Sequence, residues 1–127
     1  MKMMSVGIIG CGNISRNYAE AAKIFENFSV TACSDQDLSR AEALAGEFGI
    51  SKALPVDALL ADPDVELVIN LTVPAAHSDV TEQVLASGKH VYSEKPLALR
   101  RREAREMMAL AREKGLRIGC APDTFLG

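Results

Sequence analysis

The sequence predicts an α/β fold, built on a doubly wound parallel sheet of six strands with helices on both faces. Short apolar runs of strand-like composition alternate along the chain with segments whose apolar residues recur at helical spacing. A glycine turn lies between the first apolar run and the first helical segment, where such a sheet has its first ligand-binding loop. The chain has 127 residues, of which 48% are hydrophobic and 24% charged, as expected for one globular domain.

The first two predicted strands are joined by the glycine turn and a helix. Residues 6–9 form a continuous apolar run, which is typical of a strand buried on both faces. Apolar residues then recur at helical spacing, at Ile14, Tyr18, Ala21, Ala22 and Phe25. Residues 29–34 give the second strand, and a second helical stripe over residues 38–48 ends at Gly49, in the position of a C-terminal cap.

The middle of the chain repeats this pattern with shorter elements. Residues 51–54 are predicted to form the third strand, and a small helix follows Pro55. A turn over residues 62–64 then leads into an apolar fourth strand over residues 65–71. The alternation continues without an internal repeat or a low-complexity stretch.

The last third of the chain supplies two further strands and two helices. Apolar residues mark one stripe of a helix that Gly88 closes: Val80, Val84 and Leu85. Residues 89–93 predict the fifth strand, and residues 116–121 predict the sixth. An amphipathic helix is predicted over residues 100–114, before a stop at Gly115. Its expected inward-facing residues are Ala104, Met107, Met108 and Ala111.

The strand order follows from the connections. Because strand–helix–strand crossovers are right-handed and place helices on both faces, the expected order is 3-2-1-4-5-6. In that order, the loops after the first and fourth strands border one crevice at the carboxyl edge of the sheet. The glycine turn and residues 72–77 are therefore expected to face the same ligand.

The glycine turn has the chemistry of a diphosphate-binding loop. Gly10 permits a tight turn, and Gly12, which has no Cβ, lets a diphosphate approach the amides at the start of the helix. Ser15 stands where a third glycine is often found, and it adds only a small side chain. The expected cofactor-binding residues of this loop are Gly10, Gly12, Asn13 and Ile14.

Asp35 is the expected ribose ligand. It lies 20 residues beyond Ser15 and follows the second strand, where a carboxylate accepts hydrogen bonds from the adenosine ribose hydroxyls. Its charge repels the 2′-phosphate of NADP, so NAD is the expected cofactor and NADP the less favoured one, although Arg40 lies close in sequence. The alternative is that Gly10 and Gly12 only shape a turn while Asp35 caps the next helix.

Composition and charge argue against several other classes of protein. The net charge of −3 provides no broad basic surface for nucleic acid. Cys11, Cys33 and Cys120 are too widely spaced to suggest a disulfide framework or a zinc site, so the cytoplasm is the expected location. No apolar run approaches the roughly 20 residues that span a bilayer. Cys11 itself is interpreted either as a reactive thiol or as a small packing residue.

Two further strings connect these features to a known family. VPAAH (residues 73–77) follows the fourth predicted strand, and GKHVYSEKPLA (residues 88–98) contains the fifth. With the glycine turn and Asp35, they make the chain resemble the N-terminal half of the Gfo/Idh/MocA oxidoreductases, whose cofactor domain is a Rossmann fold. These are NAD(P)-dependent enzymes that act largely on sugars and polyols. The resemblance covers nearly the whole chain, and its most specific part is the string around Lys95.

The resemblance implies roles for the residues of these strings. Lys95 would be the active-site lysine, which contacts the substrate hydroxyl and stabilises the alkoxide that develops there. Glu94 and Pro96 would shape its loop, through a Lys–Pro peptide bond that is often cis in relatives. The implied cofactor-binding set on the nicotinamide side is Thr72, Pro74, His77, Glu94, Lys95 and Pro96. Glu94 would contact the nicotinamide ribose or serve the fold alone, and His77 has the alternative role of satisfying free amides at a helix start.

The resemblance also implies that the chain is one part of a larger enzyme. Residues 1–121 correspond to the dinucleotide-binding domain, and residues 122–127 to the start of a connection to a second α/β domain with the substrate site and the oligomer interface. The chain is therefore expected to bind NAD with little or no turnover. The parent enzyme is expected to be a homo-oligomer acting on a sugar or polyol-type small molecule, without a nucleic-acid or membrane partner. Two alternatives stay open: a non-catalytic NAD-responsive binding module and, less favoured, an S-adenosylmethionine-dependent methyltransferase.

Overall fold

The sheet has the predicted strand order. The computed structural model describes residues 3–122, which form one parallel sheet in the order β3-β2-β1-β4-β5-β6. The strands are β1 (Met4–Ile9), β2 (Phe28–Ser34), β3 (Lys52–Ala53), β4 (Leu67–Asn70), β5 (His90–Ser93) and β6 (Ile118–Cys120). The helices are α1 (Ser15–Ala22), α2 (Leu38–Phe48), α3 (Val56–Ala61), α4 (His77–Ala86) and α5 (Arg101–Lys114), and a short 3₁₀ helix, η1 (Pro74–Ala76), precedes α4. The predicted fold class is confirmed.

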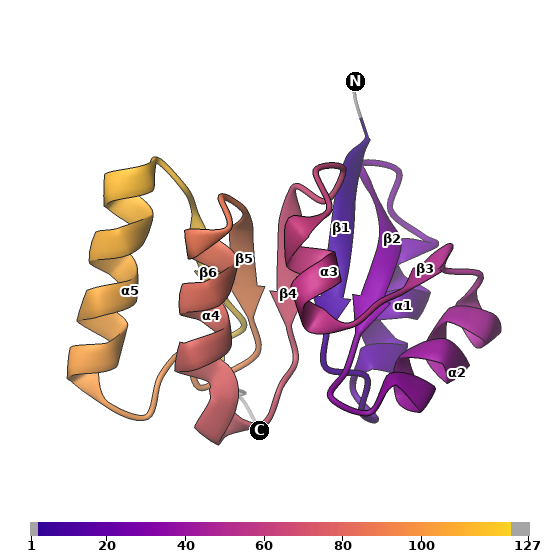
Figure 1. Cartoon of the computed structure of the whole chain (residues 1–127), viewed down its shortest axis with the longest axis horizontal. Helices are drawn as coiled ribbons and strands as arrows, with labels where there is room; N and C mark the ends of the chain where they lie inside the picture. Colours follow the sequence, from indigo (N-terminus) through magenta and orange to yellow (C-terminus); the bar gives the residue numbers. More distant parts are fainter. Residues whose placement is uncertain (1–2, 123–127) are drawn as a thin grey trace.

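Helices cover both faces of the sheet, as Figure 1 shows. One face is packed by α1 and α2, over the half of the sheet that contains β1, β2 and β3, and the other face by α3, α4 and α5. Neighbouring residues of β1 point to opposite faces, so Ile8 lies in the core beside α1 and α2, whereas Ile9 lies in the core beside the other helices. Because both faces of β1 are buried over residues 6–9, this part of its sequence is a continuous apolar run instead of an alternating one.

Two details of the predicted helices are wrong. α1 ends at Ala22, and Phe25, which was expected in its apolar stripe, is 56% exposed beyond it and stacks on Phe28 at 6.0 Å between ring centroids. In α5, Met107 is buried but Met108 is 50% exposed. The buried residues of α5 are Met107 and Ala111, which are four positions apart, and successive helix residues point about 100° apart, so Met108 lies outside the buried stripe.

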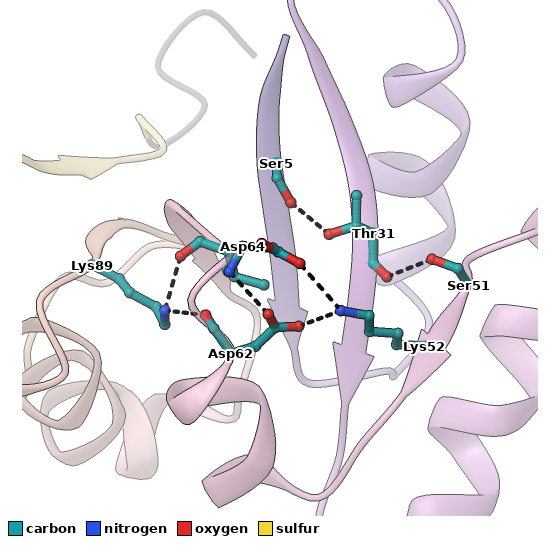
Figure 2. A network of polar contacts seen from close by, with 8 residues as sticks. Ser5, Thr31, Ser51, Lys52, Asp62, Asp64 and Lys89 are labelled. Carbon is teal, nitrogen blue, oxygen red and sulfur yellow. Dashed lines mark hydrogen bonds and ion pairs between the residues drawn. The ribbon is translucent and has the colours of Figure 1, made fainter.

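A polar network holds the edge of the sheet at which β4 and β5 begin (Figure 2). Lys89, expected inside the fifth strand, precedes β5, and its buried ammonium donates to the backbone oxygens of Asp62 and Val65 at 2.6 and 2.8 Å. The Asp62 carboxylate is 2.8 Å from Lys52 Nζ and accepts the Asp64 N–H at 2.9 Å. The network thus ties the turn before β4 to β3 and to the turn before β5.

Neither a membrane-spanning helix nor a cluster of metal-binding side chains is found among the described residues. Within residues 3–122, no helix is long and apolar enough to cross a bilayer. No group of three or more His, Cys, Asp and Glu side chains in this range is arranged to hold a metal ion. Of the expected connection over residues 122–127, positions 123–127 lie outside the described residues.

Candidate functional site

The turn between β1 and α1 lies tightly against the chain that follows β4. Gly10 has a φ of +103°, and its N–H donates to the backbone oxygen of Ser34 at 2.8 Å. A Cβ on Gly10 would lie 2.6 Å from the backbone carbonyl carbon and oxygen of Leu71. Both the backbone angle and this close approach favour glycine. Ser15, in place of a third glycine, is buried and donates its hydroxyl to the backbone oxygen of Gly12, within the turn itself.

Gly12 faces open space at the start of α1. Among residues 3–122, a Cβ built on Gly12 would have no heavy atom within 4 Å apart from its own chain neighbours, and no side chain caps the N terminus of α1. An open cavity of about 500 Å³ adjoins the turn, with Asn13 and Arg16 on one side and Arg40 and Glu47 of α2 on the other. Amides at an uncapped helix N terminus bind anions. The turn therefore offers the room and the helix terminus that a diphosphate requires.

Asp35 is tied to the glycine turn. Its Oδ2 accepts the N–H of Cys11 at 2.8 Å, and its Oδ1 accepts the N–H of Asp37 at 2.9 Å. The alternative in which Asp35 caps α2 is wrong, because Asp37 is the N-cap and accepts the N–H of Ser39. The half-exposed Asp35 carboxylate keeps further lone pairs that can accept ribose hydroxyls. Arg40 is exposed, with its Nε 3.9 Å from Asp37.

Asn70, which the sequence analysis did not single out, organises the loop after β4. It is fully buried, and its Oδ1 accepts both the N–H and the hydroxyl of Thr72, at 3.2 and 2.7 Å. Its Nδ2 donates to the backbone oxygen of His77 and to Thr81 Oγ1, at 3.1 and 3.0 Å. A polar residue at the end of an apolar strand is the signal that could have found it, because Asn commonly forms a turn with the residue two positions ahead.

His77 lies between the loops that follow β4 and β5. Its side chain is buried, with Nδ1 2.6 Å from the backbone oxygen of Pro96 and Nε2 2.6 Å from the backbone oxygen of Thr72. The alternative role, in which His77 satisfies free amides at a helix start, is wrong, because both ring nitrogens contact carbonyl oxygens. Pro74, by contrast, begins η1 and is exposed.

The Glu94-Lys95-Pro96 segment follows β5 at the same edge of the sheet. The peptide bond between Lys95 and Pro96 is cis, as the resemblance implies, and Lys95 is exposed. Glu94 Oε2 accepts the hydroxyl of Tyr18 at 2.7 Å, which joins α1 to this loop. Burial and this hydrogen bond raise the pKa of Tyr18 above its ordinary value. Sequence reasoning missed the contact because Tyr18 and Glu94 are 76 positions apart.

The Cys11 thiol is packed inside the turn. It is 9% exposed, and its Sγ donates to the backbone oxygen of Ser34 at 3.2 Å. Hydrogen bonding to Cys33 and burial raise the pKa of the Cys11 thiol. A protonated, buried thiol is a poor nucleophile, so the structure favours the packing role for Cys11 over the reactive one.

One edge of the sheet gathers the predicted site residues. Gly12 follows β1, Asp35 follows β2, Thr72 follows β4 and Lys95 follows β5, and β1 and β4 are neighbours in the sheet. This is the carboxyl edge, at the point where the strand order reverses. Along this edge the chain presents a carboxylate, an uncapped helix terminus and an amine, which suits an extended ligand with ribose hydroxyls and phosphates.

Comparison with known proteins gives matches over nearly the whole chain. A family model described as "Oxidoreductase family, NAD-binding Rossmann fold" (GFO_IDH_MocA) matches residues 4–121. The chain is 37% identical over 114 residues to 1,5-anhydro-D-fructose reductase of Ensifer adhaerens, a match that covers 89% of the chain and 34% of the reductase.

Solved structures are similar over the same part. A 3-ketoreductase from Actinomadura kijaniata in complex with NADP superposes with a TM-score of 0.89 at 32% identity, over 94% of this chain and 38% of that one. GenD2 from gentamicin A biosynthesis, in complex with NAD, also gives a TM-score of 0.89, at 30% identity, over 95% of this chain and 35% of that one. The chain thus spans about a third of the length of the relatives it matches.

Proposed function

This chain belongs to the Gfo/Idh/MocA oxidoreductase family through its NAD-binding Rossmann fold, and on that premise we propose that it is the cofactor-binding part of an NAD(P)-dependent oxidoreductase. The full-length enzyme would transfer hydride between a nicotinamide cofactor and a sugar or polyol-type hydroxyl. One observation carries the cofactor assignment: an uncapped helix terminus beside the open side of Gly12, with the Asp35 carboxylate bonded to the same loop. That combination provides for a diphosphate and an adjoining ribose together.

The chain's residues would hold the cofactor from both sides of the crevice. Gly12 and the amides at the start of α1 would hold the diphosphate, and Asp35 would accept the hydroxyls of the adenosine ribose. The loops after β4 and β5, with Thr72 and the segment 94–96, would border the nicotinamide side. When bound, the cofactor supplies the hydride acceptor or donor.

Lys95 would act on the substrate. Lys95 is exposed on the loop that follows β5, and β5 ends at the edge of the sheet that holds the other site residues. From there, Nζ would donate a hydrogen bond to the reacting oxygen and stabilise the negative charge that develops on it. Glu94, held by the Tyr18 hydroxyl, would keep the start of this loop in place.

We propose that NAD is preferred over NADP, since the Asp35 carboxylate would lie against the 2′-phosphate of NADP. Family membership does not decide this preference, because similar structures contain either NAD or NADP. Calorimetric titration of the purified chain should give NADH an affinity at least about tenfold above that of NADPH. The variant Asp35→Asn, which removes the charge, should reduce the difference between the affinities for NADH and NADPH.

The control for this experiment is Asp37→Asn. Asp37 is two residues away, and its role as the N-cap of α2 is one that Asn can also fill. This variant should keep the preference for NADH. Equal affinities of the wild-type chain for NADH and NADPH would contradict the role of Asp35, and the absence of binding by either would contradict the proposed function.

We further propose that the 127-residue chain alone has little or no turnover. It spans about a third of its relatives, and hydride transfer requires a positioned substrate as well as a cofactor. An absorbance assay of the purified chain with NAD and a panel of sugars and polyols should therefore give no substrate-dependent NADH. Robust sugar-dependent NADH formation would contradict this. Homo-oligomer formation and a cytoplasmic location of the full-length protein stay predictions from the sequence.

A further inference from the structure

The ring of His77 makes two short contacts with atoms that can only accept a hydrogen bond. Nδ1 lies 2.6 Å from the backbone oxygen of Pro96 and Nε2 lies 2.6 Å from that of Thr72, with the side chain 1% exposed. A backbone carbonyl has no proton to donate, so each contact is a hydrogen bond only where the ring nitrogen carries a proton. A neutral imidazole carries a proton on one nitrogen only. Both contacts are therefore satisfied together only by the doubly protonated ring.

His90 provides a contrast within the same chain, which has two histidines. Its Nδ1 accepts the backbone N–H of Arg117 at 3.0 Å. An accepting nitrogen carries no proton, so His90 is neutral in this arrangement, with its ring proton on Nε2. The partners of the two histidines thus favour opposite protonation states.

We propose that His77 is a buried imidazolium that positions the nicotinamide side of the site, by donating one hydrogen bond to the loop after β4 and one to the loop after β5. The inference rests on the proposed function, which assigns these two loops to the nicotinamide end of the cofactor. His77 is a positioning residue, because both of its ring nitrogens are occupied by backbone oxygens of the chain.

The two hydrogen bonds of His77 join the loop after β4, which Asn70 holds in place, to the loop after β5, which carries Lys95. Thr72 is held from its other side by Asn70, which is itself buried at the end of β4. Pro96 follows Lys95 directly, so a bond to its carbonyl restrains the Lys95 loop relative to the end of β4. Hydrogen bonds from a charged donor are about twice as strong as neutral ones, which offsets part of the cost of burying the charge.

The protonation state can be read from the wild-type chain without ligand. In a two-bond proton–nitrogen correlation spectrum of ¹⁵N-labelled protein near neutral pH, both ring nitrogens of His77 should have the shifts of protonated nitrogens. His90 should show one unprotonated nitrogen, Nδ1, and so serves as the internal reference. An unprotonated nitrogen on His77 would overturn the imidazolium assignment.

The positioning role is tested by titrating NADH and ADP-ribose, which lacks the nicotinamide, into wild type, His77→Gln and the matched control His90→Gln. A glutamine at position 77 has one donating nitrogen, which cannot lie at both ring-nitrogen positions, so one loop is released. NADH affinity should fall about tenfold in this variant, while ADP-ribose affinity stays within about twofold. His90→Gln should keep both affinities, because its amide oxygen can accept the Arg117 N–H.

The outcomes separate the inference from the proposed function. The positioning role would be overturned if His77→Gln lost affinity for NADH and ADP-ribose to the same extent, or lost affinity for neither. A wild-type chain that binds neither NADH nor ADP-ribose would overturn the proposed function and the positioning role, while the ring spectrum still decides the protonation state. If His77→Gln does not fold, wild type provides the test: the His77 ring resonances should move with NADH and not with ADP-ribose, and an unmoved ring would overturn the proposal.

Discussion

At the scale of single residues, Gly10 and Gly12 are two positions apart but should respond differently to the same substitution. Gly10→Ala places a Cβ 2.6 Å from the Leu71 backbone at a φ of +103°, so it should lower the free energy of unfolding, on the order of 3 kcal/mol. Gly12→Ala places its Cβ in open space, so it should leave stability within about 1 kcal/mol of wild type and weaken NADH binding.

Denaturant unfolding and calorimetric titration of the two variants make this comparison. Gly12→Ala serves as the matched control for the stability of Gly10→Ala, and the two substitutions are chemically identical. Equal stability of the two variants would show that the approach of Gly10 to Leu71 does not constrain the turn. Unchanged NADH affinity in Gly12→Ala would show that the open side of the turn is not where the diphosphate binds.

Whether a site residue could be predicted from the sequence depends on how far away its contact partner lies in the sequence. Gly10, Gly12 and Asp35 could be predicted from spacing, because a loop and the end of the next strand are fixed by one strand–helix–strand unit. The hydrogen bond between Tyr18 and Glu94 could not be predicted, since it joins residues 76 positions apart and depends on how α1 packs against the sheet. The packing of His77 between two carbonyls likewise depends on the relative placement of two loops.

At the scale of elements, the type and order of each strand and α-helix could be predicted, but the short helix η1 and the ends of the elements could not. Hydrophobic periodicity extends through residues that pack against an element without belonging to it. Val65 is buried, as a strand residue would be, but it lies in the turn before β4, where its backbone oxygen accepts the Lys89 ammonium. Phe25 is apolar at helical spacing, but it lies beyond the end of α1.

The pairing of β4 with β5 explains why the loops that follow these two strands meet. The strands are parallel, with Asn70 opposite Ser93, so both end at the same level of the sheet. The Glu94 N–H then donates to the backbone oxygen of Asn70 at 3.0 Å, which continues the ladder by one bond. The loops that follow the two strands therefore leave the sheet side by side, and the ring of His77 contacts both of them.

At the scale of the whole molecule, the two edges of the sheet have different chemistry. The carboxyl edge carries the open glycine turn and the exposed Lys95, whereas the opposite edge carries the network of Lys52, Asp62 and Lys89 (Figure 2). Hydrogen bonding between Lys52 and Asp62 lowers the pKa of Asp62 and raises that of Lys52, while burial lowers the pKa of Lys89. Stability rises with pH below the ordinary lysine pKa of 10.5 as Lys89 loses its proton in the fold, and it falls above 10.5 as Lys52 loses its own. The acid range avoids both lysines and tests the Asp62 carboxylate.

The stability of the fold should depend on Asp62 at low pH. A carboxyl group with a lowered pKa in the folded state stabilises the fold above its ordinary pKa of 3.8, and this contribution is lost as the pH falls through the lowered value. Lys52→Met removes the main partner of Asp62. The variant should therefore be less stable than wild type at pH 7, and the difference in free energy of unfolding should narrow below about pH 4.

Urea unfolding of both proteins between pH 7 and pH 2 measures this narrowing. Arg102→Met is the matched control, because Arg102 also pairs with a carboxylate, Glu106, at 3.3 Å, but with both side chains exposed. The free energy of unfolding of Arg102→Met should differ little from that of wild type, and this difference should be nearly constant with pH. A difference between wild type and Lys52→Met that stays constant down to pH 2 would exclude Asp62 as the titrating group.

Under the proposed function, the hydrogen bond from the Cys11 N–H to the Asp35 carboxylate would affect how quickly a dinucleotide binds. Together with the bond from Gly10 to Ser34, it gives the receiving loop its shape before anything occupies it. A loop that is already ordered loses little conformational entropy on binding, so little of the binding free energy is spent on ordering the protein. Under the proposed function, the rate of binding would then be governed by diffusion and by the orientation of the incoming molecule, without a slow rearrangement of the loop.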